Sequence, residues 1–332
     1  MNISFFEFLR GAVSSPQLLA ASLLTLGVIF VNGWTDAPNA IASCVCSGTL
    51  TMKRAVLLAA VCNFSGVLIM TYVNCSVARN IFSSADFSGS PHGHTALCAA
   101  LASVIILAVG AWIFGIPTSE SHAIISALIG AALACGAPVH VRVIIYTFVG
   151  LVLSVAGGFI AGYFLFGFMK RREYNERKLR HMQTAGAALM SFMHGAQDGQ
   201  KFISIFLVAV SLSTNVSGFG IPTWTIVLCS VVMALGTALG GGRIIRTVGK
   251  KMVKLDLKQG VCADIAGGLS LFLSTCLGLP VSTTHAKTSA VMGCGFVDSA
   301  LDSKTAFEML AAWVITFPAC FIMGYVFTRL AI

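Results

Sequence analysis

The chain has 332 residues, of which 57% are hydrophobic and only 10% are charged, and its mean hydropathy is +0.88. A soluble domain usually carries about 25% charged residues, so the composition excludes an ordinary soluble protein and indicates a surface that faces lipid. The net charge of +9 does not indicate nucleic-acid binding, because most of the excess lies in two short loops, 170–181 and 242–258. Short basic loops are typical of the cytoplasmic side, so we expect a multi-pass protein of the cell (inner) membrane in contact with the lipid bilayer.

In chain order, the apolar runs long enough to cross a membrane lie at 17–31, 55–75, 96–114, 141–167, 203–218, 220–241, 259–277 and 305–331. Patches rich in Gly, Pro and polar residues interrupt the pattern at 32–40, 115–122 and 278–285. Irregular backbone at membrane depth is tolerated only where it is buried in protein or lines a cavity. We therefore predict an all-α integral membrane fold with discontinuous helices, two re-entrant hairpins and about 10–12 membrane segments.

The chain repeats itself. Residues 115–130 align without gaps to residues 278–293, with eight of 16 positions identical at an offset of 163. Independently, Gly33-Trp-Thr-Asp36 aligns to Gly195-Ala-Gln-Asp198 at an offset of 162. Two separate polar motifs whose offsets differ by only one residue indicate two homologous halves. We assign a first repeat to 15–135, a connecting span and basic cytoplasmic loop to 136–177, a second repeat to 178–298 and a C-terminal span to 299–332.

Charge suggests that the two halves are inverted relative to each other. The loop at 242–258 holds six Lys and Arg residues, whereas the equivalent loop of the first half, near 79–95, holds only Arg79. If basic loops stay in the cytoplasm, these equivalent loops face opposite sides of the membrane. Inverted repeats with broken helices that meet at the membrane midplane are typical of secondary transporters that work by alternating access.

The hydroxyl-rich patches at 117–121 and 280–284 each precede a predicted half-helix. Free N–H groups at a helix N-terminus bind anions, phosphate above all, and Ser and Thr hydroxyl groups add hydrogen bonds to a tetrahedral oxyanion. The alternative is ordinary capping of two helices, which needs only one hydroxyl group per helix. Because each patch holds three hydroxyl groups, two of them at matching places, we favour an anion site made by Ser119, Ser121, Ser282, Thr283 and Thr284.

Asp36 and Asp198 occupy matching positions, which we expect to lie in matching broken segments, with Gly33 and Gly195 as helix breakers. A carboxyl group beside an anion site makes sense if it binds a cation or carries a proton, which would couple the substrate to an ion gradient. Thr35 and Asn39 offer neutral oxygen atoms, so Asp36 with Asn39 is a candidate sodium site. Lys201 stands where the repeat matches Asn39, and a fixed ammonium group can replace one bound cation. This asymmetry favours protons over sodium as the coupling ion.

Three further ionisable groups lie in or beside apolar stretches, namely Glu120, Asp264 and Lys287. A charged group at membrane depth is a functional candidate by default, whereas the alternative is a charge at a helix end that reaches the headgroups. For Asp264, near a predicted helix start, both interpretations stay open. His122 and His285 match across the repeat and either hold the shape of the hairpins or relay protons.

At these residues the sequence resembles the inorganic phosphate transporter (PiT) family. The family motif is close to Gly-Ala-Asn-Asp-Val-Ala-Asn-Ala, and the two copies here are 33–40 and 195–202. The resemblance also covers the hairpin motifs and the run at 241–249, and it extends over almost the whole chain. It implies an inverted-repeat fold and cotransport of inorganic phosphate with sodium or protons. Matched position by position, it implies a substrate site with the two Asp residues, the hairpin hydroxyl groups, and Thr35 and Gln197, which replace the Asn of the motif.

Other functions remain as alternatives. A sulfate permease of the same fold is the runner-up, although sulfate cannot donate a hydrogen bond to the two carboxyl groups as phosphate can. A membrane-embedded enzyme acting on phosphate esters is disfavoured, because catalytic sites are seldom duplicated and inverted. A channel is disfavoured by inverted halves around one site. We expect no enzyme activity and no cofactor other than the coupling ion, and a homo-oligomer stays open.

Overall fold

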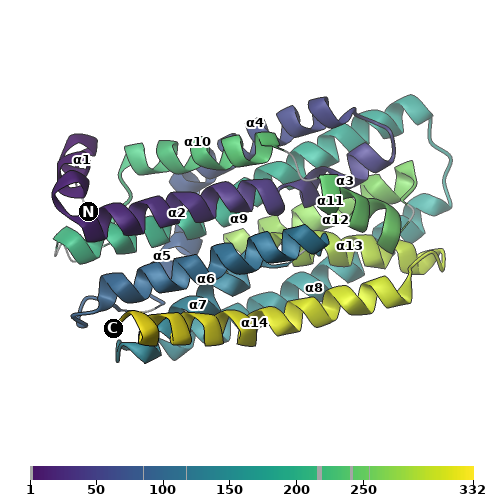
Figure 1. Ribbon diagram of the computed structural model, residues 1–332. Coiled ribbons are helices and arrows are strands. Elements are labelled where there is room, and N and C mark those ends of the chain that lie inside the picture. Colours follow the sequence, from purple (N-terminus) through teal and green to yellow (C-terminus); the bar gives the residue numbers. More distant parts are fainter. Residues whose placement is uncertain (1–2, 85, 117, 215–218, 240–241, 254) are drawn as a thin grey trace.

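The computed structural model describes residues 3–84, 86–116, 118–214, 219–239, 242–253 and 255–332, except the side chains of 249–251 (Figure 1). These residues form an elongated bundle of helices, and the described ranges contain no β-strand. The all-α fold predicted from the sequence is therefore confirmed. The helices are α1 (Phe5–Ser14), α2 (Pro16–Thr35), α3 (Pro38–Cys46), α4 (Met52–Val73), α5 (Ser76–Phe82), α6 (Gly93–Phe114), α7 (Glu120–Ala134), α8 (Val141–Lys170), α9 (Glu176–Thr214), α10 (Thr223–Leu239), α11 (Gly242–Arg246), a short π-helix η1 (Thr247–Met252), α12 (Leu257–Cys276), α13 (Thr283–Val297) and α14 (Ser303–Ala331).

Five stretches of helix are long and apolar enough to cross a membrane: Pro16–Cys46, Met52–Val73, Gly93–Phe114, Val141–Lys170 and Ser303–Ala331. Large apolar side chains on α4, α8 and α14 point outward, among them Leu57, Phe164 and Val314, each more than 60% exposed. An apolar outer surface of this extent is stable only against lipid. The protein is a multi-pass membrane protein.

The first polar motif breaks a helix as predicted. α2 ends at Thr35, and α3 begins at Pro38. Asp36 N–H still bonds to Asn32 O at 2.9 Å, but Pro38 has no N–H group to continue the ladder and instead stands at the first position of the new helix. The break leaves Asp36 and Asn39 on either side of an interrupted backbone inside the protein.

The second copy of the motif does not break its helix, and this part of the prediction is wrong. α9 runs without interruption from Glu176 to Thr214 and carries Gly195 and Asp198 in its middle. The first copy has Ala37-Pro38 where the second has Gly199-Gln200, so the second lacks the proline that ends α2. A glycine alone lowers helix stability only by about 1 kcal/mol, which packing on all sides readily offsets.

The motif glycines allow helices to approach closely rather than break them. A Cβ atom on Gly195 would lie 2.2 Å from Asn63 O on α4, and one on Gly33 would lie 2.3 Å from Met233 O on α10. Each helix of the motif thus packs on a helix of the other half. These contacts between the halves agree with the predicted pairing of the two repeats. The inversion of one repeat relative to the other stays a prediction.

We expect Gly195→Ala to lower the free energy of unfolding by about 2 kcal/mol, because the added methyl group would overlap the α4 backbone and force the helices apart. Thermal unfolding of the purified protein in detergent measures this. Gly110→Ala is the matched control, since nothing lies within 4 Å of its Cβ position. Equal stability of the two variants would contradict the close α4–α9 contact.

Two helical hairpins carry the repeated sequence. α6 and α7 form the first, and α12 and α13 form the second. Both turns begin with a glycine in the left-handed region, Gly115 and Gly278, each with φ of 68°. In both, a serine then caps the second helix: His122 N–H bonds to Ser119 Oγ at 3.3 Å, and His285 N–H bonds to Ser282 Oγ at 3.2 Å. Pro117 lies outside the described residues.

The basic segments lie together at one end of the bundle. Lys258 Nζ donates to Arg172 O at 2.8 Å, which joins the two loops rich in Lys and Arg. α11 lies toward this end, whereas α5, in the equivalent part of the first half, lies toward the other (Figure 1). We call the end of the bundle that carries the two loops rich in Lys and Arg the basic end. By the positive-inside rule we expect it to face the cytoplasm.

Candidate functional site

The two repeated aspartates meet at the centre of the protein. Asn32 on α2 joins them, because its Nδ2 donates to Asp36 Oδ2 at 3.3 Å and to Asp198 Oδ2 at 3.2 Å. Both carboxyl groups are buried, with 4% and 1% of each residue exposed. Two acidic residues that are 162 positions apart in the sequence thus share one buried amide group.

Lys201 is the cation of this site. One turn along α9 from Asp198, its Nζ donates to Asp198 Oδ1 at 2.7 Å and to Ser121 Oγ at 2.6 Å, and it also bonds to Val281 O. The ammonium group therefore contacts α9 and both hairpins. An unpaired charge would be costly at this depth, and the carboxylate with the two further oxygen atoms compensates it.

Hydroxyl groups at the starts of the two hairpin helices complete the site. Thr283 Oγ1 donates to Asp198 Oδ2 at 3.2 Å, and Thr284 Oγ1 donates to Asp36 Oδ1 at 2.6 Å. Asn39 Nδ2 donates to Thr284 Oγ1 at 3.1 Å. We call this arrangement the central site; its members are Asn32, Asp36, Asn39, Ser121, Asp198, Lys201, Thr283 and Thr284.

The remaining predicted residues take other positions. Ser119 and Ser282 cap their helices, so the capping interpretation holds for one hydroxyl group of each patch. Thr35 bonds to Glu120 and to Val31 O rather than to the aspartates. Gln197 faces the second hairpin, where its Nε2 donates to Thr275 Oγ1 at 3.0 Å and to Leu279 O at 3.2 Å.

Sequence reasoning left Asn32 and His194 out of the predicted site and named Glu120 only as an ionisable group at membrane depth. Asn32 links the carboxyl groups, Glu120 pairs with Thr35, and His194 Nε2 lies 3.4 Å from Asp198 Oδ2. The repeat held a signal for them, since Asn32 matches His194 at the offset of 162 and Glu120 matches Thr283 at the offset of 163. Polar residues at matching positions thus line one site from both halves.

Several buried oxygen atoms of the site have no hydrogen-bond donor among the described residues. They are Asn32 Oδ1, Asn39 Oδ1 and Glu120 Oε2. Buried polar atoms are nearly always satisfied in folded proteins. Acceptors without donors suit a ligand that brings protons or a cation. Ligand atoms of Asp36, His194 and Asp198 also lie within 4.8 Å of one another, close enough to share one cation.

His122 and His285 face each other beside the central site, with ring centroids 4.8 Å apart. His285 also packs on Trp313 and His122 on Phe317, both on α14. Neither imidazole ring bonds to a described residue. The two hairpins therefore touch through this histidine pair, and a hydrogen bond from either ring to a hairpin carbonyl is not found in the described parts of the chain.

A second polar cluster lies buried between the basic end and the central site. Asp264 is fully buried and forms an ion pair with Lys287. Ser43 Oγ donates to Asp264 Oδ1 at 2.6 Å, and Gln183 bonds to Asp264 Oδ2. The interpretation of Asp264 as a charge that reaches the headgroups is therefore wrong. We call these four residues the Asp264 cluster.

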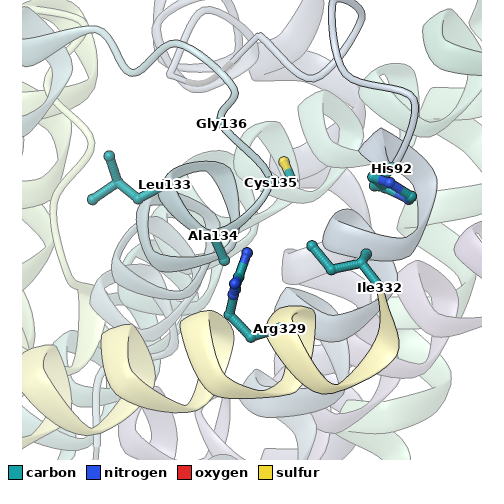
Figure 2. Close-up of a pocket in the computed structure, with 7 residues that line it drawn as sticks. All are labelled: His92, Leu133, Ala134, Cys135, Gly136, Arg329 and Ile332. Atoms are coloured by element: carbon teal, nitrogen blue, oxygen red, sulfur yellow. The ribbon is translucent and has the colours of Figure 1, made fainter.

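An open pocket of about 570 Å³ lies elsewhere, at the far end of α7 and α14 (Figure 2). His92, Arg329 and the backbone around Gly136 contribute to it, and no residue of the central site does. The central site is instead enclosed by the side chains around it, which leave its members buried.

Comparison with known proteins identifies the chain. Residues 32–324 match the model of the phosphate transporter family. A protein of Bacillus subtilis named "Probable low-affinity inorganic phosphate transporter" is 36% identical over 91% of this chain and 93% of its own length. "Low-affinity inorganic phosphate transporter PitB" of Escherichia coli is 25% identical over 92% of this chain and 95% of its own length.

A solved structure has the same fold. "The sodium-dependent phosphate transporter" superposes with a TM-score of 0.85 over 95% of this chain and 99% of its own, at 18% identity. The matching family consists of transporters rather than enzymes, and the match extends over most of the chain. This chain belongs to the phosphate transporter family.

Proposed function

We propose that this chain is a secondary active transporter that imports inorganic phosphate by symport with protons, through alternating access of the central site. The observation that carries the proposal is the burial of two carboxyl groups and one ammonium group among hydroxyl groups from both hairpins. The positive ends of α7 and α13, together with Lys201, attract an oxyanion. The carboxyl groups and the unsatisfied oxygen atoms accept hydrogen bonds from it.

Phosphate fits this mixture of donors and acceptors better than sulfate. At neutral pH phosphate still carries protons, so it donates to Asp36 or Asp198 while its other oxygen atoms accept from Thr283, Thr284 and Lys201. Sulfate has no proton to donate, and its negative charge would be repelled by the two carboxylate groups. The names of the relatives from B. subtilis and E. coli support phosphate as the substrate.

The charged groups of the central site favour protons as the coupling ion. Asp198 is already paired with Lys201 at 2.7 Å, so the fixed ammonium group takes the place that a mobile cation would need. The hydrogen-bond donors to the Asp36 carboxyl group in the described part of the chain are neutral: the side chains of Asn32 and Thr284 and the backbone N–H of Glu120. A proton on Asp36 would remove an uncompensated buried charge, which makes this residue the proposed carrier of the coupled proton.

Sodium is the second candidate. The solved structure that shares the fold is described as sodium-dependent, and Asp36, His194 and Asp198 could share one cation. In that case the cation would bind between Asp36 and the unsatisfied Oδ1 of Asn39. Both candidates use the same carboxyl groups, so only a flux measurement separates them.

Alternating access accounts for the closed site. The residues of the central site are no more than 4% exposed, so the substrate enters and leaves only if the surrounding helices move. We propose that the two hairpins, which touch through His122 and His285, move relative to each other and open the site to one side at a time.

Uptake of labelled phosphate into proteoliposomes tests the proposal. With an inward proton gradient and no sodium, we expect saturable uptake that a protonophore abolishes and that a large excess of sulfate leaves nearly unchanged. Uptake only after sodium is added would retain phosphate as the substrate and overturn the proton assignment. Uptake abolished by sulfate would indicate a sulfate permease, and flux that never saturates would indicate a channel.

A further inference from the structure

The Asp264 cluster reproduces the chemistry of the central site contact by contact. In the cluster, Lys287 Nζ contacts Asp264 Oδ1 and lies 3.1 Å from Ser43 Oγ. Ser43 donates to the same carboxylate oxygen, and the amide of Gln183 bonds to the other one. In the central site a lysine, a serine and an amide group contact the two oxygen atoms of Asp198 in the same pattern.

The cluster joins four helices and is packed too tightly for phosphate. Its members come from α3, α9, α12 and α13. A Cβ atom on Gly260 would lie 2.5 Å from Gln183 Oε1, and one on Gly186 would lie 2.8 Å from Asp264 Cβ. The space around the carboxylate therefore admits a group the size of an ammonium or a monovalent cation, but not a tetrahedral oxyanion.

The first half of the chain has no such cluster. Subtracting the repeat offsets places Ala21 opposite Gln183, Leu101 opposite Asp264 and Ile124 opposite Lys287, and adding 162 places Ile205 opposite Ser43. All four of these residues are buried in one hydrophobic core. The fold therefore accepts an apolar cluster at this position, and the ion pair of the second half is not needed for packing.

The oxygen atoms around Lys287 are those that a bare cation would use. Asp264 supplies a carboxylate and Ser43 a hydroxyl group, and Gln183 Oε1 is buried without a hydrogen-bond donor in the described part of the chain. Carboxylate, hydroxyl and amide oxygen atoms are the ligands of hard cations. The ammonium group of Lys287 occupies the position of such a cation.

We propose that the Asp264 cluster is a second cation site, separate from the central site, in which Lys287 serves as a permanently tethered cation. The site takes a monovalent cation of the size of Na⁺ or Li⁺ once the ammonium group is removed. With Lys287 in place, no free ion is required to hold α3, α9 and the second hairpin together. This inference does not depend on which ion drives phosphate uptake.

Thermal unfolding of purified Lys287→Ala in detergent, in NaCl, LiCl, KCl or choline chloride at equal ionic strength and without phosphate, tests the site. We expect Tm to rise by about 5 °C or more in Na⁺ or Li⁺ relative to choline, because a bound cation stabilises only the folded state. Ile124→Ala is the matched control, since it truncates the equivalent buried side chain where no carboxylate is present. Because both variants keep the central site unchanged, any sodium bound there shifts Tm equally in both. An identical ion response of the two variants would overturn the proposal.

The single variant leaves a buried carboxylate without its partner and so risks poor folding. Asp264→Ala/Lys287→Ala removes both charges, and we expect it to fold and to be indifferent to the cation. Lys287→Gln offers a second neutral variant with an extra oxygen atom. If neither Lys287→Ala nor Lys287→Gln accumulates in membranes of cells grown in sodium-rich medium while the double variant does, the cluster cannot hold an ion and the proposal fails. Because no flux is measured, failure of the transport proposal would not affect this result.

Discussion

Asp198→Asn should reduce proton-driven phosphate uptake at least 100-fold, a loss of about 2.7 kcal/mol or more of transition-state stabilisation. The Asp198 carboxylate contacts Lys201, Asn32 and Thr283 at once. An asparagine keeps the shape but removes the charge that compensates the buried ammonium group. Leaving such a group unpaired costs about 3–5 kcal/mol, so Lys201 should turn toward another acceptor and the hydroxyl groups should lose their alignment.

The measurement is the initial rate of labelled phosphate uptake into proteoliposomes, normalised to the amount of folded transporter. Asp302→Asn is the matched control, because Asp302 caps α14 at the surface, and asparagine caps a helix equally well. We expect the control to transport at the rate of the unchanged protein. Uptake by Asp198→Asn above a tenth of that rate would show that the central carboxylate is not required.

Lys201→Asn should lower sodium-free, proton-driven uptake about tenfold or more and create a dependence on sodium. The substitution removes the fixed cation and restores the residue that the first copy of the motif has at Asn39. Asp198 and Ser121 would then face an empty position surrounded by oxygen atoms, which a mobile cation can fill. Uptake should recover in part when sodium is added, and it should not recover with choline.

Lys304→Asn, an exposed lysine at the start of α14, is the control for this experiment. Its uptake should keep the ion response of the unchanged protein. If Lys201→Asn transports in a proton gradient without sodium as fast as the control does, Lys201 does not act as a fixed cation. If it fails in every ion, the ammonium group is needed to bind phosphate itself.

Much of the central site could be predicted because the sequence is internally repeated. The offsets of 162 and 163 pair Asp36 with Asp198 and pair the first hairpin with the second, and both relations follow from the order of residues alone. The hydroxyl groups of Ser121, Thr283 and Thr284 contact the carboxyl groups. The repeat shows which residues of the two halves are equivalent. Where equivalent residues serve one common site, they must lie close together.

The errors arise where equivalent residues differ in physical role. The alignment predicts a break in both copies of the motif, but only the first has a proline, and the second helix continues through Gly195. Gln197 matches Thr35 in the repeat, yet its amide bonds to the second hairpin whereas Thr35 bonds to Glu120, and a place for Gln197 beside the substrate stays a prediction. A motif shows which side chains match and does not show which way a continuous helix turns them.

The Asp264 cluster could not be predicted from the repeat, because nothing in the first half resembles it. Gln183 is far from Asp264 in the sequence, and Ser43 is farther still. Their contact depends on how α3, α9, α12 and α13 pack together. Only the presence of Asp264 and Lys287 in apolar surroundings signalled that some partner had to be close.

The unbroken α9 has a consequence for how the protein sits among lipids. Its 39 residues span about 58 Å at about 1.5 Å each, nearly twice the ~30 Å of the hydrocarbon layer. The excess at the basic end carries Arg177 and Lys178, both exposed, and Arg180, which donates to Gly48 O at 2.9 Å. Each such cation near anionic phospholipid headgroups contributes about 1 kcal/mol of attraction. We therefore expect the headgroups to fix the depth of α9 in the bilayer, and with it the depth of Asp198 and Lys201.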